Sequence, residues 1–216
     1  MACVESHHRA MIAGLILAGG QAKRMGGADK ALIHLAGKPL IAHVVERLKD
    51  QAKDGMAISA NGDPARFANY GLPVLPDRVP GFPGPLAGIL AGMDWAKAHC
   101  PDCRWLLSAP CDAPFIPRDL AQRLLSALQS EGAELAQASS GGRDHPVIGL
   151  WPLALADDLR HALTVERLHK VGQFARRYKR ALADFSMQNG QDPFMNVNTQ
   201  EELMTAQAAL RSTMPE

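Results

Sequence analysis

The chain has 216 residues, of which 47% are apolar and 21% charged, and its formal net charge at pH 7 is +1. These values are ordinary for a globular protein with a real hydrophobic core, and the small net charge excludes a global field that would recruit nucleic acid or an anionic membrane. The longest apolar stretch, around residues 12–18, is far too short to span a bilayer. We therefore expect no nucleic-acid or membrane partner, and any anion site must be local.

The first ten residues, MACVESHHRA, lack the basic region, apolar stretch and cleavage site of a secretory signal. We interpret residues 1–10 as a loose leader and expect a single domain over residues 11–216, a length that suits one domain.

Short apolar runs then alternate along the chain with amphipathic stretches. The expected strands are residues 11–18, 55–60, 72–76, 104–110, 133–140, 145–151 and 180–186. The expected helices are residues 39–52, 64–71, 85–99, 117–132, 153–163, 166–178 and 199–211. Thr199 and Glu202 form a capping box at the start of the last helix.

This alternation predicts an α/β fold, a Rossmann-like three-layer α/β/α sandwich with a mainly parallel sheet. Ligands of such sheets bind beyond the carboxyl ends of the strands. Gly19, Asp77 and Asp112 each follow an expected strand, so we expect all three at that edge.

The glycine-rich segment Leu15–Ile33, LILAGGQAKRMGGADKALI, follows directly from the first strand. It contains no G-x-G, which a dinucleotide-binding turn requires. A P-loop has the pattern G-x-x-x-x-G-K-[ST], so its second glycine stands five residues after the first. Here Arg24 stands five residues after Gly19, and Met25 stands five residues after Gly20. The segment is therefore neither of the two common phosphate loops.

The same segment still has what an anion site needs. Gly19 and Gly20 allow a tight turn that presents bare N–H groups to an oxygen-rich ligand. Arg24 and Lys30 can bring positive charge to phosphate oxygens, the arginine through two parallel hydrogen bonds and the lysine as a point charge.

Four cysteines are too few and too clustered for a secreted disulfide framework. The HCPDC segment contains a C-x-x-C, Cys100 and Cys103, but no second pair with zinc spacing follows. We interpret these cysteines as loop thiols rather than a metal or redox pair, and expect a cytoplasmic protein.

The glycine-rich segment resembles the opening of the Mg-dependent nucleotidyltransferases, in the residues Leu17–Gly20, Arg24–Gly26 and Lys30. Later segments narrow the resemblance to the molybdenum cofactor guanylyltransferases, and together they cover nearly the whole chain in order. They are PDRVPGFPGPLAGILAGM (residues 76–93), SAPCDAPFIPRDL (108–120), RDHPVIGLW (143–151) and FMNVNTQEEL (194–203).

The resemblance implies a sheet of the nucleotide-diphospho-sugar transferase type and transfer of GMP from GTP to the phosphate of Mo-molybdopterin. The amino-terminal part would bind GTP and the carboxyl-terminal part would mainly receive molybdopterin. Other proteins of the cofactor pathway, or molybdoenzyme chaperones, are expected partners.

The resemblance also assigns residues to the nucleotide. Leu17, Ala18, Gly19 and Gly20 would contact GTP, and the catalytic cations Arg24 and Lys30 would stabilise the triphosphate and the departing pyrophosphate. Asp112 would be catalytic as the ligand of Mg²⁺, an ion that needs few protein carboxylates because phosphate oxygens and water fill most of its shell.

Two further residues are expected at the base. Asp77 matches a nucleotide-binding aspartate, and its carboxylate can accept from both guanine N1–H and the exocyclic amine; the alternative is a turn residue. Asn61 is the expected nucleotide contact after the second strand, although Ser59 can occupy that position instead and Asn61 would then be a turn residue.

Five residues are expected on the molybdopterin side. Asn196 and Asn198 are separated by one residue, so in an extended segment they point the same way, and neutral amides add no charge to an anionic site. Arg143, Asp144 and His145 are expected to help receive molybdopterin, with a surface ion-pair network as the alternative.

Three rival functions differ from this one in testable features. A cytidylyltransferase making the cytosine form of the cofactor typically has L-A-A-G, with alanine where this chain has Gly19. A sugar-1-phosphate nucleotidyltransferase would usually be longer and lacks the PCDAP and NVNT combination. A non-catalytic cofactor chaperone would not need Lys30 and Asp112 together.

Overall fold

A seven-stranded sheet forms the centre of the computed structural model, which describes residues 11–19, 29–77, 79, 84–187 and 191–212. The strand order is β5-β4-β1-β6-β8-β7-β9. The strands are β1 (Ile12–Leu17), β4 (Met56–Ser59), β5 (Val74–Leu75), β6 (Trp105–Pro110), β7 (Leu135–Ser140), β8 (Arg143–Pro152) and β9 (Arg180–Asp184).

The strands β5, β4, β1 and β6 run parallel to one another, as do β7 and β9. Strand β8 alone runs antiparallel, and it separates the two parallel groups. Gly141 and Gly142, with φ of 54° and 75°, form the two-residue turn between β7 and β8. Positive φ at both turn residues suits glycine and matches the twist of a hairpin. The prediction of a mainly parallel sheet is confirmed.

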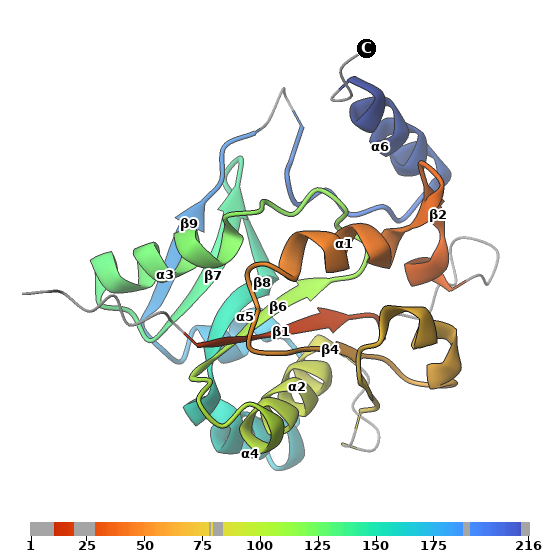
Figure 1. Cartoon of the computed structure of the whole chain (residues 1–216). Helices are drawn as coiled ribbons and strands as arrows, with labels where there is room; N and C mark the ends of the chain where they lie inside the picture. Colours follow the sequence, from red (N-terminus) through yellow and green to blue (C-terminus); the bar gives the residue numbers. More distant parts are fainter. Residues whose placement is uncertain (1–10, 20–28, 78, 80–83, 188–190, 213–216) are drawn as a thin grey trace, which may run out of the picture.

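Helices cover both faces of the sheet, as Figure 1 shows. One face carries α1 (Leu40–Leu48) and α3 (Leu120–Glu131), and the other carries α2 (Pro85–His99), α4 (Ala156–Thr164) and α5 (Val171–Ala175). Three 3-10 helices complete these connections: η1 (Lys30–Leu32), η2 (Pro64–Tyr70) and η3 (Leu153–Leu155). The predicted three-layer α/β/α architecture is therefore present.

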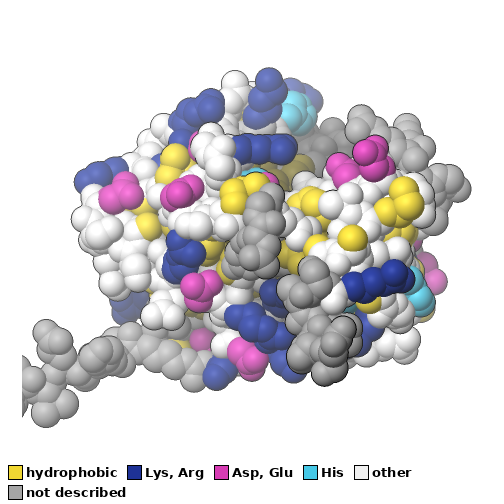
Figure 2. All heavy atoms as spheres, turned by 90° about the horizontal axis from the view of Figure 1, so that it is seen from above, with side chains coloured by type: hydrophobic (Ala, Val, Ile, Leu, Met, Phe, Trp, Pro, Cys, Tyr) yellow, Lys and Arg dark blue, Asp and Glu magenta, His cyan; other side chains and the backbone are white. Residues whose placement is uncertain are grey.

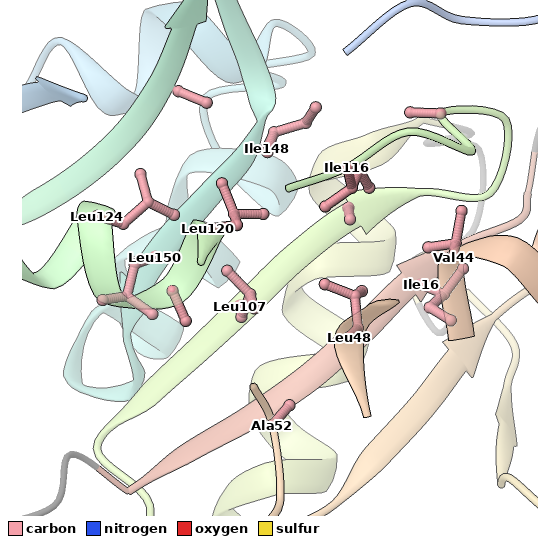
Figure 3. Close-up of a cluster of buried hydrophobic side chains, with 14 of the residues drawn as sticks. Ile16, Val44, Leu48, Ala52, Leu107, Ile116, Leu120, Leu124, Ile148 and Leu150 are labelled. Carbon is pink, nitrogen blue, oxygen red and sulfur yellow. The ribbon is translucent and has the colours of Figure 1, made fainter. Parts of the chain in front are cut away.

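The core beneath α1 and α3 is drawn in Figure 3. Val44 and Leu48 of α1, four residues apart on one helical face, pack toward Ile16 of β1 and Leu107 of β6, and Leu124 of α3 lies further along the same layer. All five are fully buried. Burial of each such side chain contributes about 1.5–3 kcal/mol, so this layer holds the parallel strands rigid beneath their carboxyl ends.

The last helix, α6 (Gln200–Ser212), returns to the amino-terminal half of the chain. It packs on a hairpin of two short strands, β2 (His34–Leu35) and β3 (Lys38–Pro39), through Leu203, Leu35 and Val197. Its capping box is formed as predicted: the Glu202 backbone N–H donates to Thr199 Oγ1 at 3.1 Å and the Thr199 N–H donates to Glu202 Oε2 at 2.9 Å.

One predicted helix is wrong over much of its length. Residues 166–178 were expected to be helical, but only Val171–Ala175 form an α-helix. Arg167 has a φ of 56°, a left-handed conformation that stops a helical path, and the Leu168 N–H turns back to the Ala162 carbonyl of α4 at 2.9 Å. Helical periodicity in the sequence did not reveal this reversal.

Charged side chains are dispersed on the face shown in Figure 2, where acidic and basic groups are interspersed. From the net charge of +1 we expected no strong electrostatic field over the whole molecule, and the mixed charges on this face agree with that expectation. None of the helices in the described ranges is long and apolar enough to cross a membrane. The expected leader, residues 1–10, lies outside those ranges.

Candidate active site

A cavity of about 230 Å³ opens at the carboxyl edge of the parallel strands. Its walls come from residues 17–19 at the end of β1, Ser59 at the end of β4, residues 110–112 at the end of β6, and the beginning of α2. Parallel strands with a common direction bring these chain ends to one edge, although they are far apart in sequence. The expected placement of Gly19, Asp77 and Asp112 at this edge is confirmed, because all three line the cavity.

The centre of the cavity is an ammonium–carboxylate–amide contact. Lys30 Nζ donates to Asp112 Oδ2 and to Asn198 Oδ1. The second oxygen of Asp112, Oδ1, is buried and has no hydrogen-bond partner among the described residues. A buried carboxylate oxygen without a partner is costly in a folded protein, so a cation or hydrogen-bond donor bound at Asp112 Oδ1 would be stabilising.

Two backbone features bring Asn198 to this position. The Val197 N–H donates to the Asp112 carbonyl at 2.9 Å, which joins the segment before α6 to the loop after β6. The Asn198 N–H donates to Glu202 Oε2 at 2.6 Å, so the same glutamate that closes the capping box also fixes the asparagine backbone. A local signal in the sequence, T-x-x-E, thus positions a residue of the site.

Asp29 fixes the backbone that carries Lys30. Its Oδ1 accepts from the Ala31 N–H at 3.1 Å and caps η1, while its Oδ2 lies 2.7 Å from Nε of Arg66 on η2. Sequence reasoning did not assign Asp29 to the site, although it lines the cavity beside Lys30. An aspartate directly before a helical turn is the signal that could have identified it.

Asp77 and Asn61 form a reciprocal pair at the rim. Asn61 Nδ2 donates to Asp77 Oδ2 at 2.8 Å, and the Asp77 backbone N–H donates to Asn61 Oδ1 at 2.9 Å. Asp77 and Ser59 line the cavity, whereas Asn61 is not among the described residues that do. Of the two positions expected after β4, Ser59 is therefore the one that faces the cavity.

The first turn of α2 approaches the strands unusually closely. A Cβ on Gly88 would lie 2.5 Å from Ser59 Oγ and 2.7 Å from Leu17 Cδ2, distances that no real side chain tolerates. Gly84 and Pro85 at the start of the helix also line the cavity. The positive end of the helix dipole therefore faces the cavity, which favours an anionic ligand.

The described lining of the cavity carries more negative than positive charge, so an anionic ligand would need a cation bound with it. Its described lining contains three carboxylates, Asp29, Asp77 and Asp112, and one ammonium group, that of Lys30. Asp29 and Asp112 have ionic partners in Arg66 and Lys30, whereas Asp77 is held by a neutral amide. A polyphosphate would need further positive charge here, because Lys30 already neutralises Asp112.

The three cysteines within the described ranges have no catalytic features. Burial raises the pKa of the Cys111 thiol, and the neighbouring Asp112 charge raises it further. Burial likewise raises the pKa of Cys100, and that of Cys103 to about 12. Both pack in the core beneath α2, as neutral thiols rather than reactive thiolates. Among the residues described, no group of three or more His, Cys, Asp or Glu side chains could hold a metal.

The residues expected to receive molybdopterin have different partners. Asp144 accepts from Arg180 of β9 at 3.0 Å, whereas His145 Nε2 lies 2.7 Å from Ser140 Oγ. The Ser140 hydroxyl donates its only proton to Asp192 Oδ1, so His145 is the donor in the His145–Ser140 bond. Burial lowers the pKa of His145, and the Asp192 carboxylate opposes that shift.

The remaining predicted residues are placed as follows. Arg143 and Asn196 are exposed, and Asn198 is partly buried beside Lys30. Gly20 and Arg24 lie outside the described residues. The structure therefore brings together Leu17, Ala18, Gly19, Lys30, Asp77 and Asp112 around the cavity, with Asn198 bonded to Lys30.

Known proteins resemble the chain in sequence and in fold. The profile of the MobA-like NTP transferase domain matches residues 14–182. A molybdenum cofactor guanylyltransferase of Rhodopseudomonas palustris (strain BisB5) is 53% identical over 200 residues, which cover 92% of this chain and 94% of the relative. One from Cereibacter sphaeroides is 51% identical over 198 residues, 92% of this chain and 96% of the relative.

Among solved structures, molybdopterin-guanine dinucleotide biosynthesis protein A from Archaeoglobus fulgidus superimposes with a TM-score of 0.71. The alignment covers 93% of this chain and 100% of that one at 18% sequence identity. The likeness agrees with the α/β sheet described above and extends over nearly the whole chain.

Proposed function

Since this chain belongs to the MobA-like NTP transferase family and, within it, to the molybdenum cofactor guanylyltransferases, we propose that its cavity binds GTP and transfers GMP to the terminal phosphate of Mo-molybdopterin. The products are the guanine dinucleotide form of the cofactor and pyrophosphate. The observation that carries the proposal is the joint placement of Lys30, Asp112 and Asn198 at the carboxyl edge, beside the loop after β1.

The reaction is an in-line displacement between anions. An oxygen of the acceptor phosphate attacks the α-phosphorus of GTP, the bond from that phosphorus to the bridging oxygen breaks, and pyrophosphate leaves with the electron pair. The protein must therefore supply positive charge and alignment rather than a nucleophile. The raised pKa of the Cys111 thiol agrees with this, because it leaves the thiol neutral beside the reacting groups.

The chain's own residues divide this work. Residues 17–19 and the first turn of α2 present backbone to the nucleotide, and the dipole of α2 favours its phosphates. Lys30 would leave Asp112 and stabilise the triphosphate and the departing pyrophosphate. Arg24, in the same segment, is proposed to add a second cation to those oxygens.

Asp112 fits a divalent cation, for which we propose Mg²⁺. Its Oδ1 is buried and without a partner among the described residues, and a hard carboxylate oxygen is the ligand type that Mg²⁺ prefers. The bound ion would supply positive charge to phosphate oxygens that a single lysine cannot neutralise. A single protein carboxylate is compatible with this assignment, because phosphate and water oxygens complete the shell of Mg²⁺ in nucleotide sites.

The base and the acceptor occupy opposite sides of this centre in the proposal. Asp77 at the rim is the proposed acceptor for guanine N1–H and the exocyclic amine. Asn196, Asn198 and the amino end of β8, from Arg143 to His145, are proposed to receive molybdopterin. The three described cysteines are buried and unbridged, which suits a reducing compartment, and we propose the cytoplasm. Contact with other cofactor-pathway proteins or molybdoenzyme chaperones is proposed for delivery of the acceptor.

The test is anaerobic release of pyrophosphate from GTP or CTP in the presence of Mo-molybdopterin. Release with GTP and little with CTP is expected; release with CTP alone would instead favour the cytidylyltransferase, and no GTP-dependent product would refute the function. Binding of Mn²⁺ in the presence of GTP, followed by electron paramagnetic resonance, tests the metal ligand separately. Asp112→Asn should lose this binding, whereas Asp50→Asn, which removes an exposed carboxylate after α1, should keep it.

A further inference from the structure

We propose that Asn61 is a positioning residue for guanine selection, which acts by holding the Asp77 carboxylate and does not itself touch the nucleotide. The inference rests on the proposed function, because it assumes that Asp77 reads the base. It departs from the expectation that Asn61 contacts the nucleotide directly.

The first step is the pairing of both ends of the Asn61 amide with Asp77. One N–H of Asn61 Nδ2 donates to Asp77 Oδ2 at 2.8 Å, and Asn61 Oδ1 accepts from the Asp77 backbone N–H at 2.9 Å. The Asn61 amide is therefore hydrogen-bonded to both the side chain and the backbone of Asp77. These two bonds fix the side-chain torsions of Asp77 relative to its own backbone. Asp77 lines the cavity, whereas Asn61 is not among the described residues that do.

The second step is the rigidity of the support. Strands β4 and β5 are parallel neighbours, and their ladder extends past Ser59 through the Ala60 N–H to the Leu75 carbonyl at 3.0 Å. Asn61 follows this last backbone bond directly. The hydrogen bonds of the Asn61 side chain to Asp77 thus link the two segments just beyond the last backbone bond between them.

The third step is charge. An arginine or lysine in place of Asn61 would orient the carboxylate equally well, but it would also compete with guanine for the same oxygens. A neutral amide leaves the full negative charge on Asp77, and it uses only one lone pair of Oδ2. Oδ1 and the remaining lone pair of Oδ2 stay available to accept from N1–H and from the exocyclic amine of guanine.

The readout is the ratio of kcat/KM for GTP to that for ITP, because inosine keeps N1–H and lacks the exocyclic amine. Asn61→Asp keeps an oxygen acceptor for the Asp77 N–H but replaces the donor with a repelling carboxylate, and Asn61→Ala removes both bonds without repulsion. Each variant should lower the GTP:ITP ratio by about 10- to 100-fold, the effect of one hydrogen bond to a charged group, and kcat/KM for ITP should fall less than that for GTP, because inosine can lose only the N1–H bond.

Asp63→Ala is the matched control, because Asp63 caps η2 through the Ala65 N–H in the same loop. It should lower the melting temperature slightly and leave the GTP:ITP ratio unchanged. Asp77→Ala should lose the preference, and the Asn61→Ala, Asp77→Ala double variant should match Asp77→Ala, since Asn61 acts only through Asp77.

Three results would overturn the inference: an unchanged GTP:ITP ratio in folded, active Asn61 variants, an equal loss for GTP and ITP, or an additional loss in the double variant. The last two would indicate a direct nucleotide contact or a general structural role. These outcomes are distinct from failure of the proposed function, in which the wild-type protein would form no product from GTP.

Discussion

Replacement of Gly88 by alanine should damage the nucleotide cavity far more than it damages the fold. The added Cβ would lie 2.5 Å from Ser59 Oγ and 2.7 Å from Leu17 Cδ2, and both of these residues line the cavity. Ordinary contact distances are about 3.5–4.0 Å, so the Ser59 and Leu17 side chains, the first turn of α2, or both must shift by about 1 Å.

The effect on stability is the difference of two terms. Overpacking of this kind typically destabilises by about 1–3 kcal/mol, and the better helix propensity of alanine offsets about 1 kcal/mol of it. The net loss of about 0–2 kcal/mol corresponds to a fall in melting temperature of up to about 8 °C for a chain of this size. A displacement of about 1 Å at a reacting centre, by contrast, can lower the rate about 10²-fold.

Gly92→Ala is the matched control one turn further along α2. Its Cβ would lie 2.7 Å from Leu15 Cδ2 and 3.1 Å from Leu106 Cδ2, so it is equally overpacked, but both neighbours belong to the core beneath the helix rather than to the cavity. Thermal unfolding, GTP affinity and kcat/KM should be measured for both variants. Similar melting temperatures with a much larger loss of GTP binding and turnover in Gly88→Ala are expected. Wild-type turnover in Gly88→Ala, or equal losses in both variants, would refute the reasoning.

Three other changes test the charge assignments. Lys30→Met should slow transfer about 10²–10³-fold, and Mn²⁺ should raise the melting temperature of the ligand-free variant more than that of wild type, because Asp112 is no longer neutralised; an equal rise would contradict this. The pKa of His145 is lowered by burial from the ordinary 6.5, so its contribution to stability is present above that pH and is lost as the pH falls. Between pH 7.5 and 5, wild type should therefore lose more free energy of unfolding than His145→Gln, as measured by urea denaturation, and parallel curves would count against the buried neutral imidazole. In a Cys3→Ser variant, the folded protein should react slowly with a thiol reagent at pH 8, since burial raises the pKa of Cys103 to about 12; fast reaction before denaturation would show that the thiols are accessible.

Local patterns in the sequence predicted the elements that depend on local physics. The apolar spacing of α1, the capping box of α6 and the apolar run of β1 all correspond to elements in the structure. The helix expected over residues 166–178 failed because its interruption depends on one residue, Arg167, in a left-handed conformation that helical periodicity does not record. The Gly141–Gly142 pair between two expected strands is typical of a hairpin turn, but no hairpin was predicted from it, and by itself it does not say where a hairpin joins the sheet.

The site was predictable only in part, for a physical reason. Gly19, Asp77 and Asp112 each follow an expected parallel strand, and the carboxyl ends of parallel strands meet at one edge of the sheet. Their positions in the sequence were therefore sufficient to predict that they lie at that edge, without knowledge of the loops. The contact of Lys30 with Asn198 spans 168 residues and depends on α6 packing against the β2–β3 hairpin, which no local pattern encodes. Family resemblance supplied Asn198, whereas the pairing of Asn61 with Asp77 required the structure.

The antiparallel strand β8 brings its amino-terminal residues to the same edge of the described sheet as the carboxyl ends of β1 and β6. In the parallel strands β1 and β6 the carboxyl ends form the cavity, and a further parallel strand beside β6 would bring only another carboxyl end there. Because β8 is reversed, its amino-terminal residues reach that same edge: Ser108 pairs with Gly149, so residues 143–146 extend beyond the end of β6. The reversal therefore brings the polar start of β8, with His145 bonded to Ser140, to the edge that holds the cavity, and this placement supports the proposal that the segment receives the acceptor.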